Sequence, residues 1–229
     1  RIMISILASK ASGEVDQALE RERMQFLDVS KALERKESAD PIFVDAVFED
    51  IFSTYDVQWG GFGGNQKFPH PDVIDLLLYK YMEDQDRELS DAVASTLDHM
   101  TAGLFDKIEG GVFRYSVTRD WREPHYEKML ETNLGFLRNL VHAHQVLGQE
   151  RFADTAKGVV RYLLDVLKDH ETGGFFSSQD ADEEYYRLPA AERVRSTPPK
   201  VVSDIYSGWN CEAVSTFIEM TNRGTIPVL

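Results

Sequence analysis

The residues from Gly110 to Leu130 read GGVFRYSVTRDWREPHYEKML, which combines arginines, acids and aromatic side chains just before a predicted helix. Histidine has an ordinary pKa of about 6.5, so His125 suits proton transfer near neutral pH. Glu127 and Asp120 would orient the imidazole or act as a second acid–base group. Arg114 would hold a hydroxyl or carboxylate of a substrate. One interpretation is therefore a catalytic loop that works by proton transfer.

The same stretch also fits a structural role. Its acids and bases would pair in a half-buried network that ties neighbouring loops together, because polar loop networks are common and catalytic ones are few. On this interpretation His125 caps the following helix. Glu127 is expected in the first helical turn, where a carboxylate interacts favourably with the helix dipole. The sequence leaves both interpretations open.

A second group of acids, SSQDADEE, follows the glycine-aromatic loop Gly173–Phe176. Asp180 and Asp182 resemble the paired carboxylates of sugar chemistry, in which one acid and one base are needed. The Asp-x-Asp spacing also occurs among ligands of hard cations, but the glycine and the later glutamate of a calcium EF-hand are missing. The alternative is a solvated acidic turn, or an aspartate that caps a neighbouring helix.

Aromatic residues gather in YDVQWGGFGGNQKFPHP, which runs from Tyr55 to Pro71. The flat apolar faces of Trp59, Phe62 and Phe68, next to polar groups, suit the C–H faces of sugar rings. A phosphate-binding loop is not indicated, because no strand precedes the glycines and the Gly-Lys-Ser/Thr ending is missing. The alternative is an aromatic plug between helices.

These stretches supply the candidate site residues. The candidate catalytic residues are His125, Glu127, Asp180 and Asp182. The candidate substrate-binding residues are Trp59, Phe62, Lys67, His70, Arg114, Tyr115, Asp120, Trp121 and Phe175. We expect no metal site, because His142 and His144 stand two apart on a predicted helix and so point to different faces. No cofactor is expected.

Apolar residues at spacings of three and four predict seven helices that position these side chains. The first carries, on one face, Val15, Leu19, Phe26, Val29 and Leu33. The others are expected at about 41–53, 72–82, 89–104, 127–147, 152–167 and 207–220. The helix at 127–147 is apolar on more than one side, which is typical of a helix enclosed by neighbours. Any β-structure should be short and confined to loops.

Three loops share a glycine pair followed by an apolar or aromatic residue. The pairs begin at Gly60, Gly110 and Gly173, at intervals of 50 and 63 residues. This recurrence predicts an internal repeat of a helix pair plus a glycine-aromatic loop. We expect a ring of helical hairpins whose loops line a central site. Seven helices make only about three and a half hairpins, so the ring would be incomplete in this chain.

The composition excludes several classes of protein. The 229 residues are 42% hydrophobic, which predicts a packed core. The net charge of −14 argues against binding to nucleic acid or to an anionic membrane surface. No apolar run reaches the ~18–20 residues of a membrane span. The single cysteine, Cys211, permits a reducing compartment, and we expect a cytoplasmic location.

Four motifs follow one another along the chain: GGFGGNQKFPHP, GGVFRYSVTRDWREPHYEKML, GGFFSSQDADEE and VVSDIYSGWNCEAVS. Together they resemble the six-hairpin, glycosidase-like part of the thioredoxin-domain-containing family that includes spermatogenesis-associated protein twenty and bacterial relatives. The resemblance covers roughly Phe43–Met220. The chain departs from the family pattern at Gln66, at Glu131-Thr132 and at Glu183-Glu184-Tyr185.

The resemblance implies an all-α fold, the (α/α)6 toroid of helical hairpins, related to N-acylglucosamine 2-epimerase and to several glycoside hydrolases. It also implies a thioredoxin-like domain before the toroid. On this basis residues 1–40 would be an N-terminal segment and helix leading in from a missing upstream region, and residues 41–229 a partial toroid domain. The loop candidates expected to converge at one end of the toroid are Arg114, Asp120, Trp121, His125, Glu127, Asp180 and Asp182.

Two functions stay open at this point. The first is a carbohydrate-active protein that binds a small sugar among its aromatic residues and catalyses isomerisation, epimerisation or hydrolysis. The second is a non-catalytic module that binds a glycan, peptide or protein and accompanies a thioredoxin-like domain. A narrow pocket with convergent acids would favour the first function, and a shallow aromatic groove with paired charges would favour the second.

Overall fold

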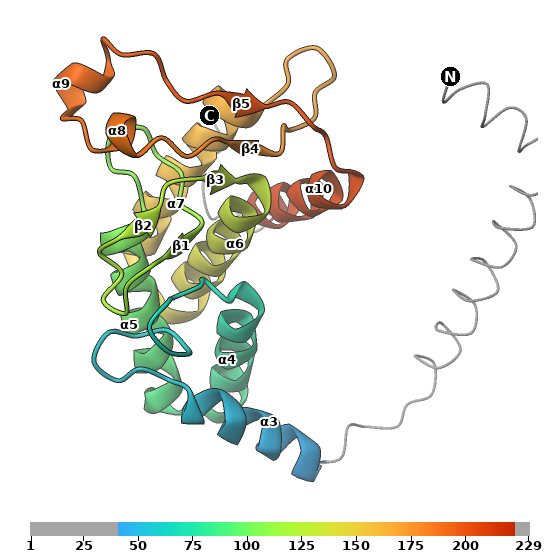
Figure 1. Cartoon of the computed structure of the whole chain (residues 1–229). Helices are drawn as coiled ribbons and strands as arrows, with labels where there is room; N and C mark the ends of the chain where they lie inside the picture. The colour runs from blue at the N-terminus through green and yellow to red at the C-terminus, as the bar shows by residue number, and fades with distance from the viewer. Residues whose placement is uncertain (1–40, 223–229) are drawn as a thin grey trace, which may run out of the picture. The chain divides into compact units, whose positions relative to one another are not determined.

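The computed structural model describes residues 41–222 of the chain (Figure 1). Eight α-helices lie in this part: α3 (Pro41–Ser53), α4 (Pro71–Asp84), α5 (Arg87–Leu104), α6 (Leu130–Leu147), α7 (Glu150–Tyr162), α8 (Glu183–Tyr186), α9 (Ala190–Arg193) and α10 (Ser207–Asn222). A π-helical segment, η1 (Leu163–Leu167), continues α7. The helix expected near Val15–Leu33 and the expected N-terminal segment 1–40 lie outside the described residues.

Short strands occupy the loops between the helices. They are β1 (Tyr115–Ser116), β2 (Pro124–His125), β3 (Lys128–Met129), β4 (Ser178–Gln179) and β5 (Val201–Val202). β1 pairs with β2, and β3, β4 and β5 form an antiparallel sheet in that order. The prediction of an all-α fold with β-structure confined to loops is therefore confirmed.

Helix α5 shows how the sequence specifies these elements. Apolar side chains at spacings of three and four are buried along one face, and Leu97, Met100 and Leu104 are fully enclosed. The helix begins after Asp86, whose carboxylate accepts a 2.9 Å hydrogen bond from the N–H of Glu88. Periodicity and capping therefore agree on this helix.

Helix α6 begins three residues later than expected. Lys128 and Met129 form strand β3 and pair with β4, so the helix starts only at Leu130. It ends before Gly148, whose φ of 66° is the left-handed conformation common at helix ends. The predicted start was wrong because local periodicity does not report pairing with a distant strand.

Helices α4, α6 and α10 pack in a row, with α6 in the middle. Helix α5 packs against α4, and α7 packs against α6. Neighbours on several sides explain why α6 is apolar on more than one side, with Leu134, Phe136 and Leu140 fully buried. The strands gather, together with α8 and α9, at the end of the bundle where α6 begins (Figure 1).

The glycine repeat is a backbone turn, Asp-x-x-x-Gly-Gly, that begins at Asp56, Asp106 and Asp169. In each turn the aspartate N–H donates to the carbonyl of the second glycine, at 2.9, 3.0 and 2.8 Å. The N–H of the first glycine donates to the aspartate carbonyl, at 2.7, 2.8 and 2.9 Å. The predicted repeat is thus one turn used three times.

Two glycines of this turn allow a matched test of packing. Gly110 and Gly173 share the same place in the turn and the same φ of 81°. A Cβ on Gly110 would lie 2.4 Å from the carbonyl oxygen of Gly158, whereas a Cβ on Gly173 would meet nothing within 4 Å. Gly173→Ala should lower the free energy of unfolding by about 1–2 kcal/mol, the cost of the left-handed backbone. Gly110→Ala should cost about 1–3 kcal/mol more.

The measurement is chemical denaturation of the two variants beside the unmodified chain. Equal losses for Gly110→Ala and Gly173→Ala would contradict the close approach to Gly158.

Candidate functional site

The first of the three turns is anchored by a buried ion pair. Lys67 Nζ lies 3.0 Å from the Asp56 carboxylate, and Arg119 donates two hydrogen bonds to the same group, at 2.6 and 2.8 Å. The Arg119 hydrogen bonds, together with Lys67, outweigh burial and hold the pKa of Asp56 well below its usual range. Lys67, a candidate substrate-binding residue, is fully buried in this pair. Its observed contacts are therefore structural.

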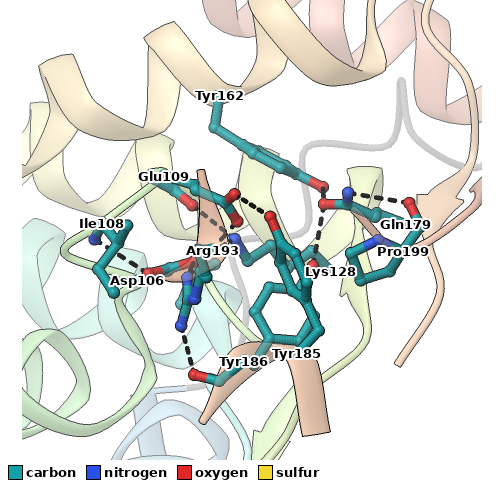
Figure 2. Close-up of polar contacts among 12 residues, drawn as sticks. Asp106, Ile108, Glu109, Lys128, Tyr162, Gln179, Tyr185, Tyr186, Arg193 and Pro199 are labelled. Carbon is teal, nitrogen blue, oxygen red and sulfur yellow. Dashed lines mark hydrogen bonds and ion pairs between the residues drawn. The ribbon is translucent and has the colours of Figure 1, made fainter. Parts of the chain in front are cut away.

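The second turn is anchored in the same way (Figure 2). Lys128 Nζ donates to Asp106 and to the carbonyl of Gly110, both at 2.8 Å, and Arg193 reaches the same Asp106 carboxylate at 2.7 Å. Burial lowers the pKa of the Lys128 ammonium, and Asp106 opposes that effect. Rings of three neighbours lie 4.8–5.1 Å from Lys128 Nζ: Phe113, Tyr162 and Tyr186.

The basic and acidic residues of the loop before α6 are also paired. Arg114 Nη1 donates to the Glu127 carboxylate at 2.9 Å, and the Arg114 backbone N–H lies within hydrogen-bond distance of the carbonyls of both His125 and Glu127. Glu127 precedes strand β3, so its expected place in a helical turn was wrong. His125 lies in β2 and does not cap α6. The structure therefore brings Arg114, His125 and Glu127 together.

An aromatic stack stands beside this pair. Tyr115 stacks on Phe68 at 4.8 Å and on His125 at 5.0 Å between ring centroids. His125 Nδ1 is buried and has no hydrogen-bond partner among the described residues. Next to the stack lies the loop-end pocket, of about 320 Å³. It is lined by Phe68, Pro69, His70, Pro71, Arg114, Met129, Glu131 and Thr132.

Three further loop candidates have contacts within the protein. Phe62 is buried, and Trp121, 1% exposed, donates from its indole nitrogen to the carbonyl of Trp59 at 2.9 Å. Asp120 accepts a 2.7 Å hydrogen bond from the hydroxyl of Thr118. The Trp121 hydrogen bond connects its loop to the loop that carries Trp59, and the buried Phe62 fits the aromatic plug considered for Tyr55–Pro71.

The acidic candidates Asp180 and Asp182 follow strand β4, which pairs with β3 directly after Glu127. Asp182 caps α8 by accepting a 2.9 Å hydrogen bond from the N–H of Tyr185. Asp180 is exposed beside it. Phe175 stacks on Phe217 of α10 at 5.8 Å. No contact described for residues 41–222 joins Asp180 or Asp182 to His125 or Glu127.

A group of polar residues that the sequence did not single out lies on the helices themselves. We call it the polar face: Asp72 and Asp75 of α4, Arg138 and His142 of α6, and Glu212 and Glu219 of α10. Arg138 donates to three carboxylates, Asp75 at 2.6 Å, Asp72 at 2.7 Å and Glu212 at 3.3 Å. One guanidinium therefore bridges three helices.

His142 lies between two carboxylates of the polar face. Its Nδ1 is 2.9 Å from Asp75 and its Nε2 is 3.3 Å from Glu219. The hydrogen bond to Asp75 raises the pKa of His142, and Glu219 adds to the effect. Asp75 and His142 also line a pocket of about 560 Å³ between α4 and α6. Its other lining residues are Leu76, Leu78, Tyr79, Met82, Gln145 and Val146.

The carboxyls of the polar face differ in their tendency to ionise. Burial opposes ionisation of Asp75, but His142 and Arg138 outweigh it and lower its pKa. Burial raises the pKa of Glu212, and Arg138 compensates only in part. The two carboxyls therefore differ in how readily they ionise, a difference that pairs of catalytic carboxyls in enzymes also show.

The sequence did carry a signal for this face. Asp72 and Asp75 are three apart, Arg138 and His142 four apart, and Glu212 and Glu219 seven apart, so each pair lies on one side of its helix. From the sequence, His142 was considered only for a metal site shared with His144, which the spacing excludes, and was not related to the acids of the other helices. Within the described residues, no group of three or more His, Cys, Asp or Glu is placed to hold a metal ion.

Comparison with known proteins identifies the fold. No protein-family model matches the chain. Spermatogenesis-associated protein 20 from Mus musculus is 34% identical over 140 residues, which cover 59% of this chain and 18% of that protein. The chain thus spans less than a fifth of the length of this relative. The expected thioredoxin-like domain stays a prediction.

Two solved structures share the helical architecture. Cellobiose 2-epimerase from Spirochaeta thermophila DSM 6192 superposes with a TM-score of 0.59 and 19% identity, over 76% of this chain and 46% of that one. The family 76 mannosidase Bt3792 from Bacteroides thetaiotaomicron VPI-5482 superposes with a TM-score of 0.58 and 18% identity, over 78% of this chain and 48% of that one. The chain therefore has the six-hairpin, (α/α)6 toroid type of fold and matches just under half of each structure. None of the described helices is both long and apolar enough to cross a bilayer.

The raised pKa of His142 predicts a pH-dependent contribution to stability. A group whose pKa is higher in the folded state stabilises the fold fully below its unfolded pKa, about 6.5, and loses that contribution as the pH rises through the folded value. Near pH 5.5, His142→Gln should lower the free energy of unfolding by about 1.5–3 kcal/mol, as expected for charged hydrogen bonds.

This difference should shrink steadily as the pH is raised to about 9, because the imidazole then loses its charge. Denaturation at several pH values measures it, with His144→Gln as the control for removing a histidine from the same helix. A His142→Gln effect that stays constant with pH would contradict the ion pairs with Asp75 and Glu219.

Proposed function

We propose that this chain belongs to a carbohydrate-active protein that binds a small sugar on the polar face and transfers protons there. The reaction would be a sugar isomerisation or epimerisation, or a glycosidase-like hydrolysis. The observation that carries the proposal is His142 between Asp75 and Glu219 at the wall of a pocket. The likeness in fold to an epimerase and a mannosidase supports the sugar as substrate class.

The proposed chemistry follows from the charge state of each group. His142 has a raised pKa and would donate a proton to a sugar oxygen, with Asp75 orienting the ring. Glu212 has a raised pKa and is the carboxyl best suited to act as an acid, whereas Asp75 stays ionised. Arg138 would act as a positioning residue, because its three hydrogen bonds hold both carboxyls.

The loop candidates keep a proposed role in substrate binding. His70 and Arg114 line the loop-end pocket at the beginnings of α4 and α6. From Glu131 in that pocket to His142 the helix rises about 16 Å, so only an oligosaccharide longer than a disaccharide would reach both regions. The proposed acid–base roles of His125, Glu127, Asp180 and Asp182 rest on residue type and the family resemblance.

One observation favours the alternative, a non-catalytic glycan- or peptide-binding module. The loop charges are paired and neutralised, as in Arg114 with Glu127 and Arg119 with Asp56. The exposed face of Phe68, 41% exposed at the end of the aromatic stack, suits a stacked ring without chemistry. In that case binding would depend on Phe68 and Arg114, and His142 would be dispensable.

Ligand-induced stabilisation separates the two functions. The 229-residue chain is screened against mannose, cellobiose and other mono- and disaccharides by thermal unfolding. A ligand at 100 times its Kd should add about 2.7 kcal/mol of stability. We expect His142→Gln to lose this response while circular dichroism shows a native helical content, and His144→Gln, the matched control, to keep it.

Each other outcome has a definite meaning. A response that survives His142→Gln but is lost in His125→Ala or Phe68→Ala would place binding in the loop-end pocket and support the alternative. No response of the unmodified chain to any sugar would contradict both sugar-binding proposals. If a sugar stabilises the chain but is not converted, the proposal of sugar binding stands and the proposal of an enzyme is contradicted.

A further inference from the structure

The segment between strands β4 and β5 forms a strap, residues 182–200, which contains α8 and α9. At its base, the N–H of Asp180 donates to the Lys200 carbonyl at 2.8 Å and Gln179 donates to the Pro199 carbonyl at 3.2 Å. The backbone hydrogen bonds described for residues 183–196 all run within the strap itself. Side chains therefore provide the polar contacts that hold its outer part against the body.

Three side chains of the strap reach into the body (Figure 2). Tyr185 donates its hydroxyl to Glu109, and Tyr186 donates to Gln179 at 3.0 Å. Arg193 is buried as deeply as the two tyrosines: it is 5% exposed, whereas the next residue, Val194, is 85% exposed. The strap thus turns a single long side chain inward at α9.

The guanidinium of Arg193 occupies a cage. Its Nη1 lies 2.7 Å from Asp106 and 3.5 Å from Glu109, and its Nη2 donates to the carbonyl of Tyr186. The rings of Tyr185 and Tyr186 lie 5.5 and 5.1 Å from its central carbon. Two carboxylates and two aromatic faces are a recognition set for a guanidinium group.

Several features would allow Arg193 to leave the cage while the rest of the fold stays intact. Helices of four residues are far too short to persist without tertiary contacts. Arg193 Nε is buried without a hydrogen-bond partner among the described residues, which reduces the net gain from inserting the side chain. When Arg193 leaves, Lys128 still neutralises Asp106, so the turn beneath keeps its anchor.

We infer that Arg193 is an internal ligand of a guanidinium-binding cage, and that its insertion latches the strap closed over the loops before α6. Opening the strap would uncover Tyr126, on which Tyr186 stacks at 5.6 Å, beside His125 and Glu127. The strap would then control access to the side of these loops opposite the aromatic stack. This inference stands independently of the proposed sugar chemistry.

Hydrogen exchange of the complete chain tests the latch. In Arg193→Ala, amides of residues 183–196 should exchange at least about tenfold faster, while those of α5 and α6 should stay within about twofold. Arg195→Ala is the matched control, since it removes an exposed arginine from the same strap, and it should leave exchange unchanged. Unchanged strap exchange in Arg193→Ala would overturn the latch. If exchange of the α5 and α6 amides accelerated as much as that of the strap, Arg193 would support the whole fold and the latch would be overturned.

A chemical rescue tests the cage. Methylguanidinium, added far below concentrations that unfold proteins, should fill the cavity of Arg193→Ala and slow strap exchange back toward that of the unmodified chain. Methylammonium at the same concentration should not, because it lacks the planar fork of donors. Equal effects of the two cations, or no effect of either, would overturn the assignment of a guanidinium-binding cage.

Discussion

The buried pair between Asp106 and Lys128 is the interaction on which the described fold depends most. Asp106 begins the turn after α5, and Lys128 lies two residues before α6, so the pair fixes where one hairpin ends and the next begins. The pair between Asp56 and Lys67 does the same before α4. Removing the aspartate of such a pair leaves the buried lysine charge uncompensated, at a cost of about 3–5 kcal/mol.

The same kind of pairing accounts for the charged residues of the loop before α6. Its charges are used within the protein: Arg119 on Asp56, Arg114 on Glu127, and Lys128 on Asp106. These pairs fix the loops from which α4 and α6 start, and Arg138 and His142 of α6 join α10 to them. The packing of α4 and α10 on α6 brings side chains of three helices to one polar face. The loops provide rigidity, and the proton transfer that we propose would use the histidine and the carboxyls of the polar face.

Local sequence signals predicted most of the fold. Periodicity placed α5 and α7, and the glycine pairs marked the repeated turn. The start of α6 was missed because strand β3 exists only through pairing with β4, about 50 residues away. The polar face was missed for a related reason. The carboxylates that surround His142 come from helices 67 and 77 residues distant. Lys67 was proposed to bind substrate, whereas the structure holds its ammonium in a buried ion pair with Asp56, a pairing that was not predicted from the sequence.

The most direct test of the account is NMR of the six histidine side chains during titration with the sugar that stabilises the chain best. His142→Gln assigns the signal of interest. We predict that the imidazole signals of His142 shift with the sugar, and that their midpoint equals the Kd from calorimetry. Shifts confined to His70 or His125, with His142 unchanged, would contradict the polar face as the site and place the ligand at the loops.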